Sequence, residues 1–390
     1  MKKQVISIDK HFRKVYNKVY DTFETIIRMI LYILEVLMQI EIIKTTAPKQ
    51  KPDENKLGFG KHFTDHMFMM DYSPDKGWHD AKIVPFGPLT LHPASTVFHY
   101  GAEIFEGLKA YRTPTGDVQL FRPTENISRL NSSAERICLP QVDPDFVLEA
   151  LKKFVEVEKD WVPSAEGTSL YLRPFLFGND ETLGVHTIQN AKYIVMASPV
   201  GSYYPEGINP VKIMIETEDV RAVRGGTGYT KCGGNYAASN RAGEIAEKKG
   251  FSQVLWLDGV ERKYIEEVGA MNVMFKIDGV VVTPKLTGSI LPGVTRKSCI
   301  QLLKDKGITV EERLISVDEL IEAAENGKLE EAWGCGTAAV VSPIGQLSYG
   351  DKNYIVNNFE IGATTHYLYD TLTSIQWGKA ADPYGWTIKI

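Results

Sequence analysis

Apolar residues recur at two different spacings along this chain, which predicts a mixture of helices and strands. After Asp143-Pro144, apolar side chains follow the helical period at Val147, Leu148, Leu151, Phe154 and Val155. Short apolar runs of strand length occupy residues 169–176, 193–196, 211–216 and 253–257. The sequence therefore predicts a fold that contains both strands and helices.

Glycine, proline and capping residues mark the ends of further elements. Asp278-Gly279 joins two apolar runs, 272–276 and 280–283, and this dipeptide is a strong hairpin signal. A helix is expected over 237–249, ended by Gly250, and another begins after Pro292-Gly293 and ends at Gly307. Ser316 and Glu319 form a capping box for a later helix. Helices mixed with hairpins favour an α/β (α+β) fold in two domains, with 201–210, which holds two Gly and two Pro, as the boundary.

The first forty residues follow a different pattern. The segment 23–43 is rich in Ile, Leu and Met, but Arg28, Glu35 and other polar residues interrupt it, so its longest charge-free run is far too short to span a membrane. Its polar residues form one stripe, which predicts an amphipathic helix, followed by a polar linker over 44–57. No small-residue cleavage site follows, so no secretory signal is expected. Two alternatives stay open, namely contact of residues 1–40 with a membrane and a true start at Met38.

Composition and charge narrow the functional classes. The chain has 390 residues and a net charge of −5, with no basic run, so no nucleic-acid partner is expected. Its four cysteines form no CxxC motif, which indicates reduced thiols and a cytoplasmic protein. His62, Asp65 and His66 come nearest to a metal site, but they lie in an expected strand, so we predict no metal.

The strongest chemical signal is the stretch from Gly225 to Tyr236, which reads GGTGYTKCGGNY. It places Lys231 among five glycines, and glycine allows the backbone to approach a ligand closely. An amine held away from water can lose its proton and attack a carbonyl. A phosphate-binding P-loop would need Ser or Thr after the lysine, whereas Cys232 follows it here. If the carbonyl is the aldehyde of pyridoxal phosphate, a carboxylate and a phosphate-binding loop should also be present.

Several motifs in the chain together resemble one family. The motifs FEGLKAYR, GTSLYLRPFLFGN, KCGGNY, YIEEVGAMN, GSILPGVTR and GCGTAAV are similar to those of the branched-chain amino acid aminotransferases, pyridoxal-phosphate enzymes of fold type IV. The likeness runs from about residue 42 to near the C-terminus. It implies the two-domain architecture of fold type IV, with an extension over 1–41, a smaller α/β domain over 42–200, an interdomain loop over 201–210, and a larger cofactor-binding domain over 211–390.

The resemblance assigns the central cofactor contacts. It makes Lys231 the catalytic Schiff-base lysine, and its freed amine would move the proton between the substrate Cα and the cofactor C4′. Glu267 would pair with the pyridine nitrogen and keep it protonated, and Tyr236 would hydrogen-bond the ring O3′. Glu266 would point to the opposite face of its strand and is expected to be solvated.

The phosphate would be held by four residues. Val294 and Thr295 begin a helix, whose free N–H groups form a ready anion site. Arg129 matches the phosphate arginine of the family, although the residues alone favour an exposed helix position for it. Thr337, in the GCGT stretch, matches a further donor to the phosphate.

The resemblance also assigns the substrate pocket, where aromatic walls suit branched aliphatic side chains. The residues are Phe105, Tyr100, Tyr171, Arg173, Tyr203, Ala338 and Ala339. Ala338 and Ala339 would bring amides to the carboxylate, and Arg173 would orient the polar groups of glutamate. The chain departs from the family at Ala270, where Ser or Thr is common. It also lacks the redox CxxC of mammalian members, since Ala339 and Ser342 stand there, so we predict no such thiol switch.

The expected function is transfer of the amino group of L-leucine, L-isoleucine or L-valine to 2-oxoglutarate. Another fold-type-IV enzyme, acting on D-amino acids or as an aminodeoxychorismate lyase, is the alternative, and a non-catalytic relative is a third. The resemblance implies a homodimer, because sites in this family take residues from the partner.

Overall fold

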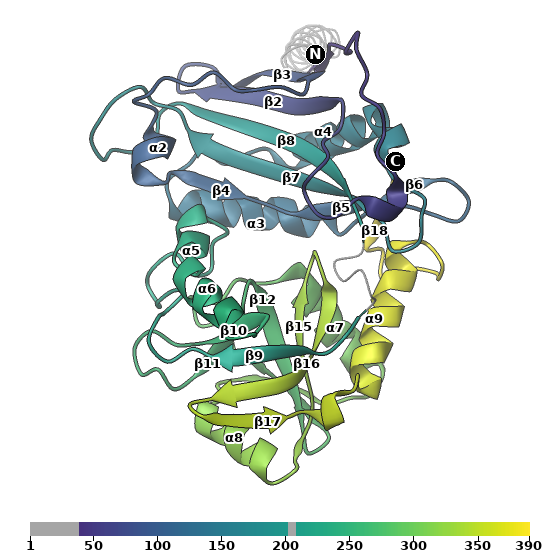
Figure 1. The fold of residues 1–390 in the computed structure, drawn as a ribbon. Coiled ribbons are helices and arrows are strands. Elements are labelled where there is room, and N and C mark those ends of the chain that lie inside the picture. The colour runs from purple at the N-terminus through teal and green to yellow at the C-terminus, as the bar shows by residue number, and fades with distance from the viewer. Residues whose placement is uncertain (1–38, 202–207) are drawn as a thin grey trace, which may run out of the picture.

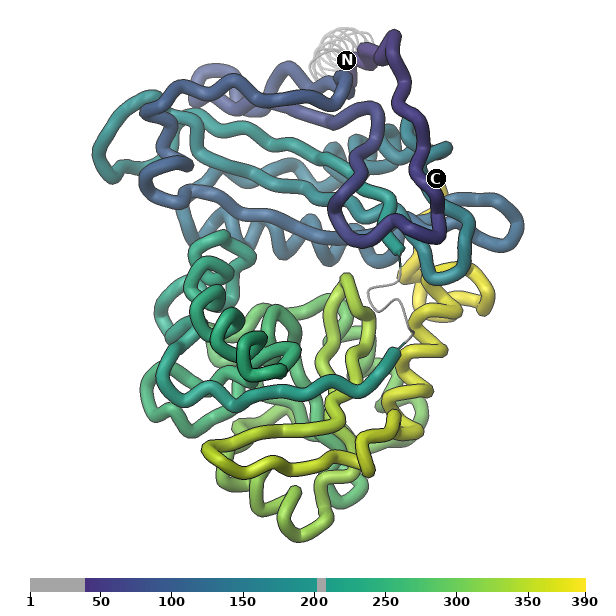
Figure 2. The backbone as a smooth tube through the Cα atoms, viewed as in Figure 1, coloured from purple at the N-terminus to yellow at the C-terminus, as the bar shows by residue number. Residues whose placement is uncertain are grey.

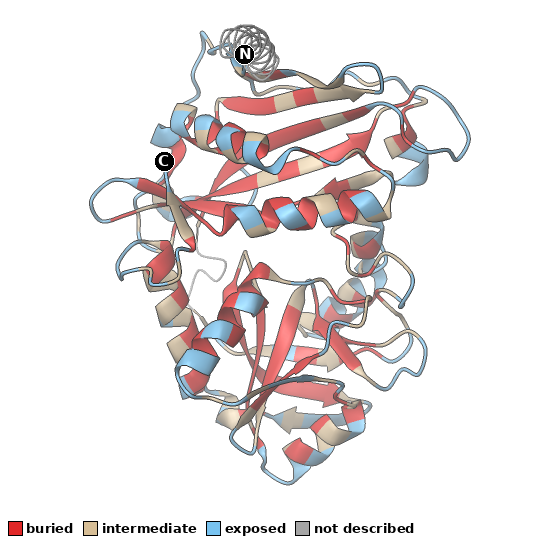
Figure 3. Ribbon diagram, turned by 180° about the vertical axis from the view of Figure 1, so that it is seen from behind, coloured by how far each residue is buried: buried red, intermediate tan, exposed pale blue. Residues whose placement is uncertain are grey.

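The computed structural model describes residues 39–201 and 208–390, and it contains two β-sheets in separate halves (Figure 1). The predicted amphipathic helix and Tyr203 lie outside the described residues. Figure 3 shows that buried positions gather along the strands of both sheets, whereas the helices alternate buried and exposed positions. This arrangement is the mixed α/β fold expected from the sequence.

The first sheet is mostly antiparallel and has the strand order β1-β3-β2-β8-β7-β5-β6-β18, with β4 paired to β7. Its strands are β1 (Glu41–Ile42), β2 (His66–Ser73), β3 (Gly77–Pro85), β4 (Glu103–Phe105), β5 (Leu108–Arg112), β6 (Val118–Phe121), β7 (Ser169–Gly178), β8 (Ala191–Val200) and β18 (Thr387–Lys389). Its helices are α2 (Thr96–Tyr100), α3 (Pro123–Arg136) and α4 (Pro144–Val157), with short 3₁₀ turns at Glu54–Lys56 and Lys159–Trp161. The apolar positions of α3 and α4 join the core of this sheet.

The second sheet has the order β11-β10-β9-β16-β15-β12-β13-β14, with β17 on β16. Because β11 also pairs with β12, the strands from β9 to β12 together with β15 and β16 close into a hydrogen-bonded ring. The strands are β9 (Val211–Ile215), β10 (Gln253–Leu257), β11 (Ile265–Val268), β12 (Met271–Ile277), β13 (Val280–Pro284), β14 (Val310–Arg313), β15 (Leu329–Gly336), β16 (Val340–Tyr349) and β17 (Lys352–Ile355). The helices are α5 (Gly233–Ala237), α6 (Asn240–Lys248), α7 (Val294–Asp305), α8 (Val317–Glu325) and α9 (Ala363–Gln376), with a 3₁₀ turn at Asn357–Phe359.

Local sequence signals place most of these elements correctly. The expected hairpin is confirmed, because β12 and β13 pair antiparallel and Asp278 and Gly279 both have positive φ, at 51° and 79°. Ser316 caps α8 by accepting a hydrogen bond from the backbone N–H of Glu319 (3.1 Å). The helix expected over 237–249 is present as α6 but begins later, at Asn240, because a turn at 238–239 separates it from the short helix α5, which was not expected. Ser239 donates to the carbonyl of Tyr236 (2.6 Å), a local bond that competes with helix continuation.

The C-terminal segment connects the two halves. Helix α9 runs from the second half toward the first, where the chain ends beside the first sheet (Figure 2). A division at 201–210 would assign the last residues to the second domain. Strand β18 instead pairs with β6, so these residues belong to the first sheet. A shared apolar core contains Tyr111 and Phe121 of the first half with Leu368 and Leu372 of α9. We retain the division into 42–200 and 211–390 as a proposal for the remaining elements.

Candidate active site

Lys231 lies in a loop between the two halves, and the first half holds this loop in place. The backbone N–H of Lys231 donates to the Ser133 hydroxyl (3.0 Å), and its carbonyl accepts from the backbone N–H of Phe105 (2.9 Å). The Lys231 Nζ donates a hydrogen bond to the Tyr236 hydroxyl (2.6 Å). Burial, assisted by the charge of Arg129, lowers the pKa of Lys231 to about 7. The amine therefore loses its proton near neutral pH.

Hydrogen bonds and close packing organise the glycine-rich loop around this lysine. The buried Asn235 side chain donates to the carbonyls of Thr227 (2.8 Å) and Thr230 (2.9 Å), so it fixes both ends of the turn before Lys231. At Gly228 an added Cβ would lie 2.3 Å from the Ser289 carbonyl oxygen, so only glycine fits. The glycines allow the close backbone approach that the sequence indicates.

Glu267 is buried on β11 and lies close enough to Lys231 for their charges to interact. Its carboxylate accepts a hydrogen bond from the backbone N–H of Leu291 (2.7 Å) and pairs with Arg221 (3.3 Å). Burial raises the pKa of Glu267, and the Arg221 charge opposes this effect. Arg221 was not predicted, because its pairing depends on a contact between distant segments.

The expectation that Glu266 is solvated is wrong. Glu266 is buried, and its carboxylate accepts a hydrogen bond from the Ser289 hydroxyl. The expectation failed because the segment before α7 covers this face of β11, which the alternation of a strand alone cannot reveal. Burial raises the pKa of Glu266, with the Ser289 hydrogen bond opposing it.

Arg129 is buried, and not exposed as its place on a helix would suggest. Its Nε and Nη2 donate to the two carboxylate oxygens of Glu106 (2.8 and 2.9 Å), and its Nη1 donates to the Pro292 carbonyl (3.1 Å). Burial alone would raise the pKa of Glu106, but the charge and hydrogen bonds of Arg129 outweigh it and lower that pKa. The sequence prediction missed Glu106, although a carboxylate inside an apolar strand–turn segment was a signal. The pair fixes Arg129 beside the start of α7.

Val294 and Thr295 form the first turn of α7, and both are buried. The first turn of any helix has N–H groups without partners inside the helix, which attracts anions. Thr337 lies in the turn between β15 and β16. The described residues predicted to hold the phosphate thus come from α3, α7 and this turn.

A cavity of about 220 Å³ opens beside Lys231. Of the predicted residues it is lined by Phe105, Tyr171, Arg173, Lys231, Thr337, Ala338 and Ala339, and in addition by Phe59, Gly107, Gln253, Ala270, Met271 and Gly336. The ring of Phe59 meets the ring of Tyr171 edge-on, with centroids 5.0 Å apart. Phe59 was missed because it follows a linker-like segment, and nothing local indicates that this segment folds back over the cavity.

Arg173 is the cation on the cavity wall. Its guanidinium lies over the Phe105 ring, 4.7 Å from the centroid, and its Nη2 donates to the Tyr171 hydroxyl (3.0 Å). Its buried Nε has no hydrogen-bond partner among the described residues. A guanidinium on the wall of a cavity favours a ligand that carries an anionic group.

Tyr100 is not part of this cavity. It is exposed, its hydroxyl accepts from the backbone N–H of Gly184 (2.7 Å), and it lines a separate depression of about 340 Å³. The cavity of one chain therefore does not include Tyr100.

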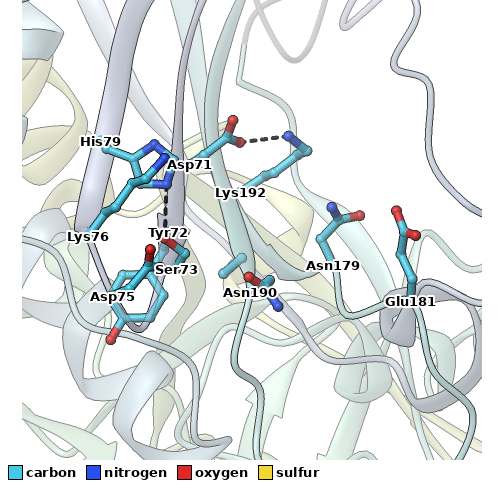
Figure 4. A pocket seen from close by; sticks show the side chains of 11 residues that line it. Asp71, Tyr72, Ser73, Asp75, Lys76, His79, Asn179, Glu181, Asn190 and Lys192 are labelled. Carbon is cyan, nitrogen blue, oxygen red and sulfur yellow. Dashed lines mark hydrogen bonds and ion pairs between the residues drawn. The ribbon is translucent and has the colours of Figure 1, made fainter.

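A larger, polar depression of about 580 Å³ lies on the first sheet and contains none of the predicted site residues (Figure 4). It is crossed by the ion pair of Lys192 and Asp71 (2.6 Å). Within residues 39–201 and 208–390, no group of three or more His, Cys, Asp or Glu could hold a metal ion. No helix in these ranges is long and apolar enough to cross a membrane.

Comparison with known proteins agrees with this geometry. The family described as amino-transferase class IV matches residues 103–347. The chain is 56% identical to branched-chain-amino-acid aminotransferase 2 of Bacillus subtilis (strain 168), over 90% of this chain and 97% of that relative. It is 53% identical to branched-chain-amino-acid transaminase 1 of the same organism, over 90% and 99%. The chain belongs to the class IV aminotransferases.

Solved structures place this class IV aminotransferase in the same fold. The branched-chain amino acid aminotransferase of Escherichia coli matches with a TM-score of 0.69 and 26% identity, over 83% of this chain and 98% of that one. The T.th. branched-chain amino acid aminotransferase with pyridoxamine 5'-phosphate matches with a TM-score of 0.69 and 26% identity, over 85% and 98%. The fold is therefore fold type IV, and the cofactor is pyridoxal 5'-phosphate.

The residues of this chain fit that cofactor. Lys231, whose pKa is about 7, can react with the aldehyde of the cofactor. The buried carboxylate of Glu267 can face the ring nitrogen of the cofactor. The free N–H groups of α7 and the guanidinium of Arg129 suit its phosphate.

Proposed function

We propose that this aminotransferase transfers the amino group of L-leucine, L-isoleucine or L-valine reversibly to 2-oxoglutarate, giving the branched 2-oxo acid and L-glutamate. The observation that carries the proposal is Lys231. Its amine has a pKa of about 7 and lies in a small cavity with aromatic walls. The names of relatives that are 53% and 56% identical support the choice of substrate.

Pyridoxal phosphate supplies an aldehyde that takes up the amino group and a ring that accepts the electron pair of the substrate Cα. The Lys231 Nζ, which is unprotonated in about half of the molecules at pH 7, accepts the proton from the substrate Cα and delivers it to C4′ of the cofactor. The Tyr236 hydroxyl, 2.6 Å away, orients this amine. The negative charge of Glu267 keeps the ring nitrogen protonated. A protonated ring accepts electrons better than an uncharged ring does.

The remaining roles are binding roles. The phosphate is held by Val294, Thr295, Arg129 and Thr337. The two hydrogen bonds from Arg129 to the Glu106 carboxylate keep the arginine in position. Phe105 and Tyr171 enclose the branched side chain and exclude water. The amides of Ala338 and Ala339 bind the α-carboxylate, and the Arg173 guanidinium on the cavity wall suits the distal carboxylate of glutamate.

We further propose that the active form is a cytoplasmic homodimer. Tyr100, assigned to the pocket by family resemblance, lies outside the cavity of its own chain and would serve the partner's. The four cysteines are unpaired thiols, which fits a reducing compartment.

A substrate panel on purified protein tests the proposed function. Titration with L-leucine should convert the bound cofactor to its amine form, with a change in absorbance, and 2-oxoglutarate should reverse it. L-isoleucine and L-valine should behave in the same way, whereas D-alanine should not react. Conversion by D-alanine without conversion by L-leucine would contradict the proposal.

A further inference from the structure

Lys109 is a buried lysine that the proposed chemistry has not used. It lies on β5, only 6% exposed, and its Nζ donates a hydrogen bond to the Ala338 carbonyl (2.9 Å). Among the described residues it forms no ion pair. Burying an ammonium without a carboxylate is costly, so such a residue calls for an explanation.

The side chain of Lys109 lies directly behind the cavity. Lys109 pairs across β5 and β7 with Tyr171, and opposite residues in paired strands project from the same face of the sheet. Tyr171 and Ala338 both line the cavity. The ammonium thus lies one residue layer from the end of the cavity where Ala338 and Ala339 are found.

The hydrogen bond to Ala338 also fixes a second group. The Ala338 carbonyl and the Ala339 N–H belong to one peptide unit, and in a planar trans peptide these two groups point in opposite directions. Holding the carbonyl toward Lys109 therefore holds the N–H away from it. The same contact joins β5 of the first half to the turn between β15 and β16 of the second.

We propose that Lys109 is a positioning residue for the substrate α-carboxylate, holding the Ala338–Ala339 peptide and supplying the positive charge behind it. This inference rests on the proposed function, because it assumes that the ligand brings a carboxylate to this turn. Lys109 must carry its positive charge at neutral pH for this role. Burial lowers the pKa of Lys109 to about 8, so most molecules carry the ammonium at pH 7.

The test compares a carboxylate with a neutral ligand of the same shape. The holoenzyme would be titrated with 4-methylpentanoate and with 4-methylpentanamide, which differs by lacking the negative charge. In Lys109→Met, binding of the carboxylate should weaken about tenfold to hundredfold, the range for losing a hydrogen-bonded charge. Binding of the amide should stay within about twofold. The KM for L-leucine should rise far more than kcat falls, and Lys109→Arg should recover much of the loss.

Lys192→Met is the matched control. Lys192 also lies in the first sheet and is paired with Asp71 away from the cavity, so this variant should bind both ligands as the wild type does (Figure 4). Lys109→Gln, which keeps a neutral donor, serves the same comparison should the Met variant not fold.

Two outcomes would overturn the inference, namely unchanged carboxylate binding in Lys109→Met, or in Lys109→Gln where the Met variant does not fold, and equal weakening of both ligands in that variant. A wild-type protein that fails to transaminate L-leucine would instead contradict the proposed function.

Discussion

At the scale of single residues, we propose that Glu267 determines how well the cofactor ring accepts electrons, because it keeps the ring nitrogen protonated. Replacing it by Gln removes the charge opposite the ring nitrogen but leaves the phosphate contacts in place. We expect Glu267→Gln to keep its cofactor and to lose turnover by on the order of 10²-fold or more, as when a preorganised electrostatic contact is removed. Single-turnover kinetics with L-leucine and cofactor content would measure the two effects separately.

Glu266→Gln provides the comparison for this variant. Glu266 is also buried on β11 but bonds Ser289 on the opposite face, and its raised pKa makes a neutral amide a close mimic. Its turnover should remain within a few-fold of wild type. Equal losses in the two variants would show that β11 is disturbed as a whole and that Glu267 has no special role.

The Lys231 pKa gives a prediction for pH. Burial lowers this pKa to about 7, and only the unprotonated amine attacks an aldehyde. Cofactor-free protein should therefore bind pyridoxal phosphate covalently at a rate that rises with pH and levels off above about pH 7 to 8. Stopped-flow absorbance measures this rate. A rate that still rose about tenfold per pH unit near pH 9 would indicate an ordinary lysine.

Sequence identified the residues that carry local signals but not those whose role depends on burial. Lys231 stands out because glycines surround it, and Glu267 follows from family resemblance. Glu106, Arg221 and Lys109 were not foreseen as contributors, because each buried charge is explained only by a contact with a distant segment. The positions of Arg221 and Lys109 in the sequence resemble those of ordinary loop or strand residues, whereas Glu106 carried a signal in its apolar surroundings.

At the scale of elements, the start of α7 depends on close packing at Gly293. An added Cβ there would lie 2.0 Å from the Asn272 Oδ1, and Asn272 in turn donates to the Leu291 carbonyl (2.9 Å). Gly293→Ala should therefore shift the first turn of α7 and weaken cofactor binding by about tenfold or more, because the phosphate relies on the N–H groups of that turn. Equilibrium dialysis of the cofactor measures the change.

Gly243→Ala is the control for this substitution. Gly243 lies within α6 with open space at its Cβ position, so alanine should stabilise the protein by about 0.5–1 kcal/mol and leave cofactor affinity unchanged. Unchanged affinity in Gly293→Ala as well would contradict the role given to the start of α7.

The elements themselves were largely predictable, since caps and hairpin residues act locally. The hairpin at Asp278-Gly279 and the capping of α8 by Ser316 formed as expected. The break between α5 and α6 was missed because a side-chain hydrogen bond from Ser239 decides it. The strands at 169–176 and 193–196 are longer than expected, because each is extended by its pairing with the other.

At the scale of the whole molecule, an exposed apolar surface supports the proposed dimer. Leu183 and Val185 are exposed in one loop beside Phe98 and Tyr100 of α2, and Val185 is 86% exposed. Val185→Asp should weaken self-association, measured as a shift from dimer to monomer mass in sedimentation at micromolar concentration. Val260→Asp, at a 79% exposed position in the other half, should leave the mass unchanged. A wild-type monomer would contradict the dimer.

The joining of the two halves was the least predictable feature. The cavity takes Phe105 and Tyr171 from the first sheet and Thr337 and Ala338 from the turn between β15 and β16 of the second half, and β18 returns to the first sheet at the end of the chain. Such long-range contacts are not marked by local spacing. Family resemblance, and not periodicity, supplied most of the pocket residues.

The most direct test of the account is to locate the covalent link to the cofactor. Freshly isolated protein would be reduced with borohydride, digested, and analysed by mass spectrometry. We predict that the pyridoxyl phosphate group is found on the peptide that contains Lys231, and not on Lys109, the other lysine with a strongly lowered pKa near the cavity. Modification at Lys109 or elsewhere, or none at all, would contradict the central claim.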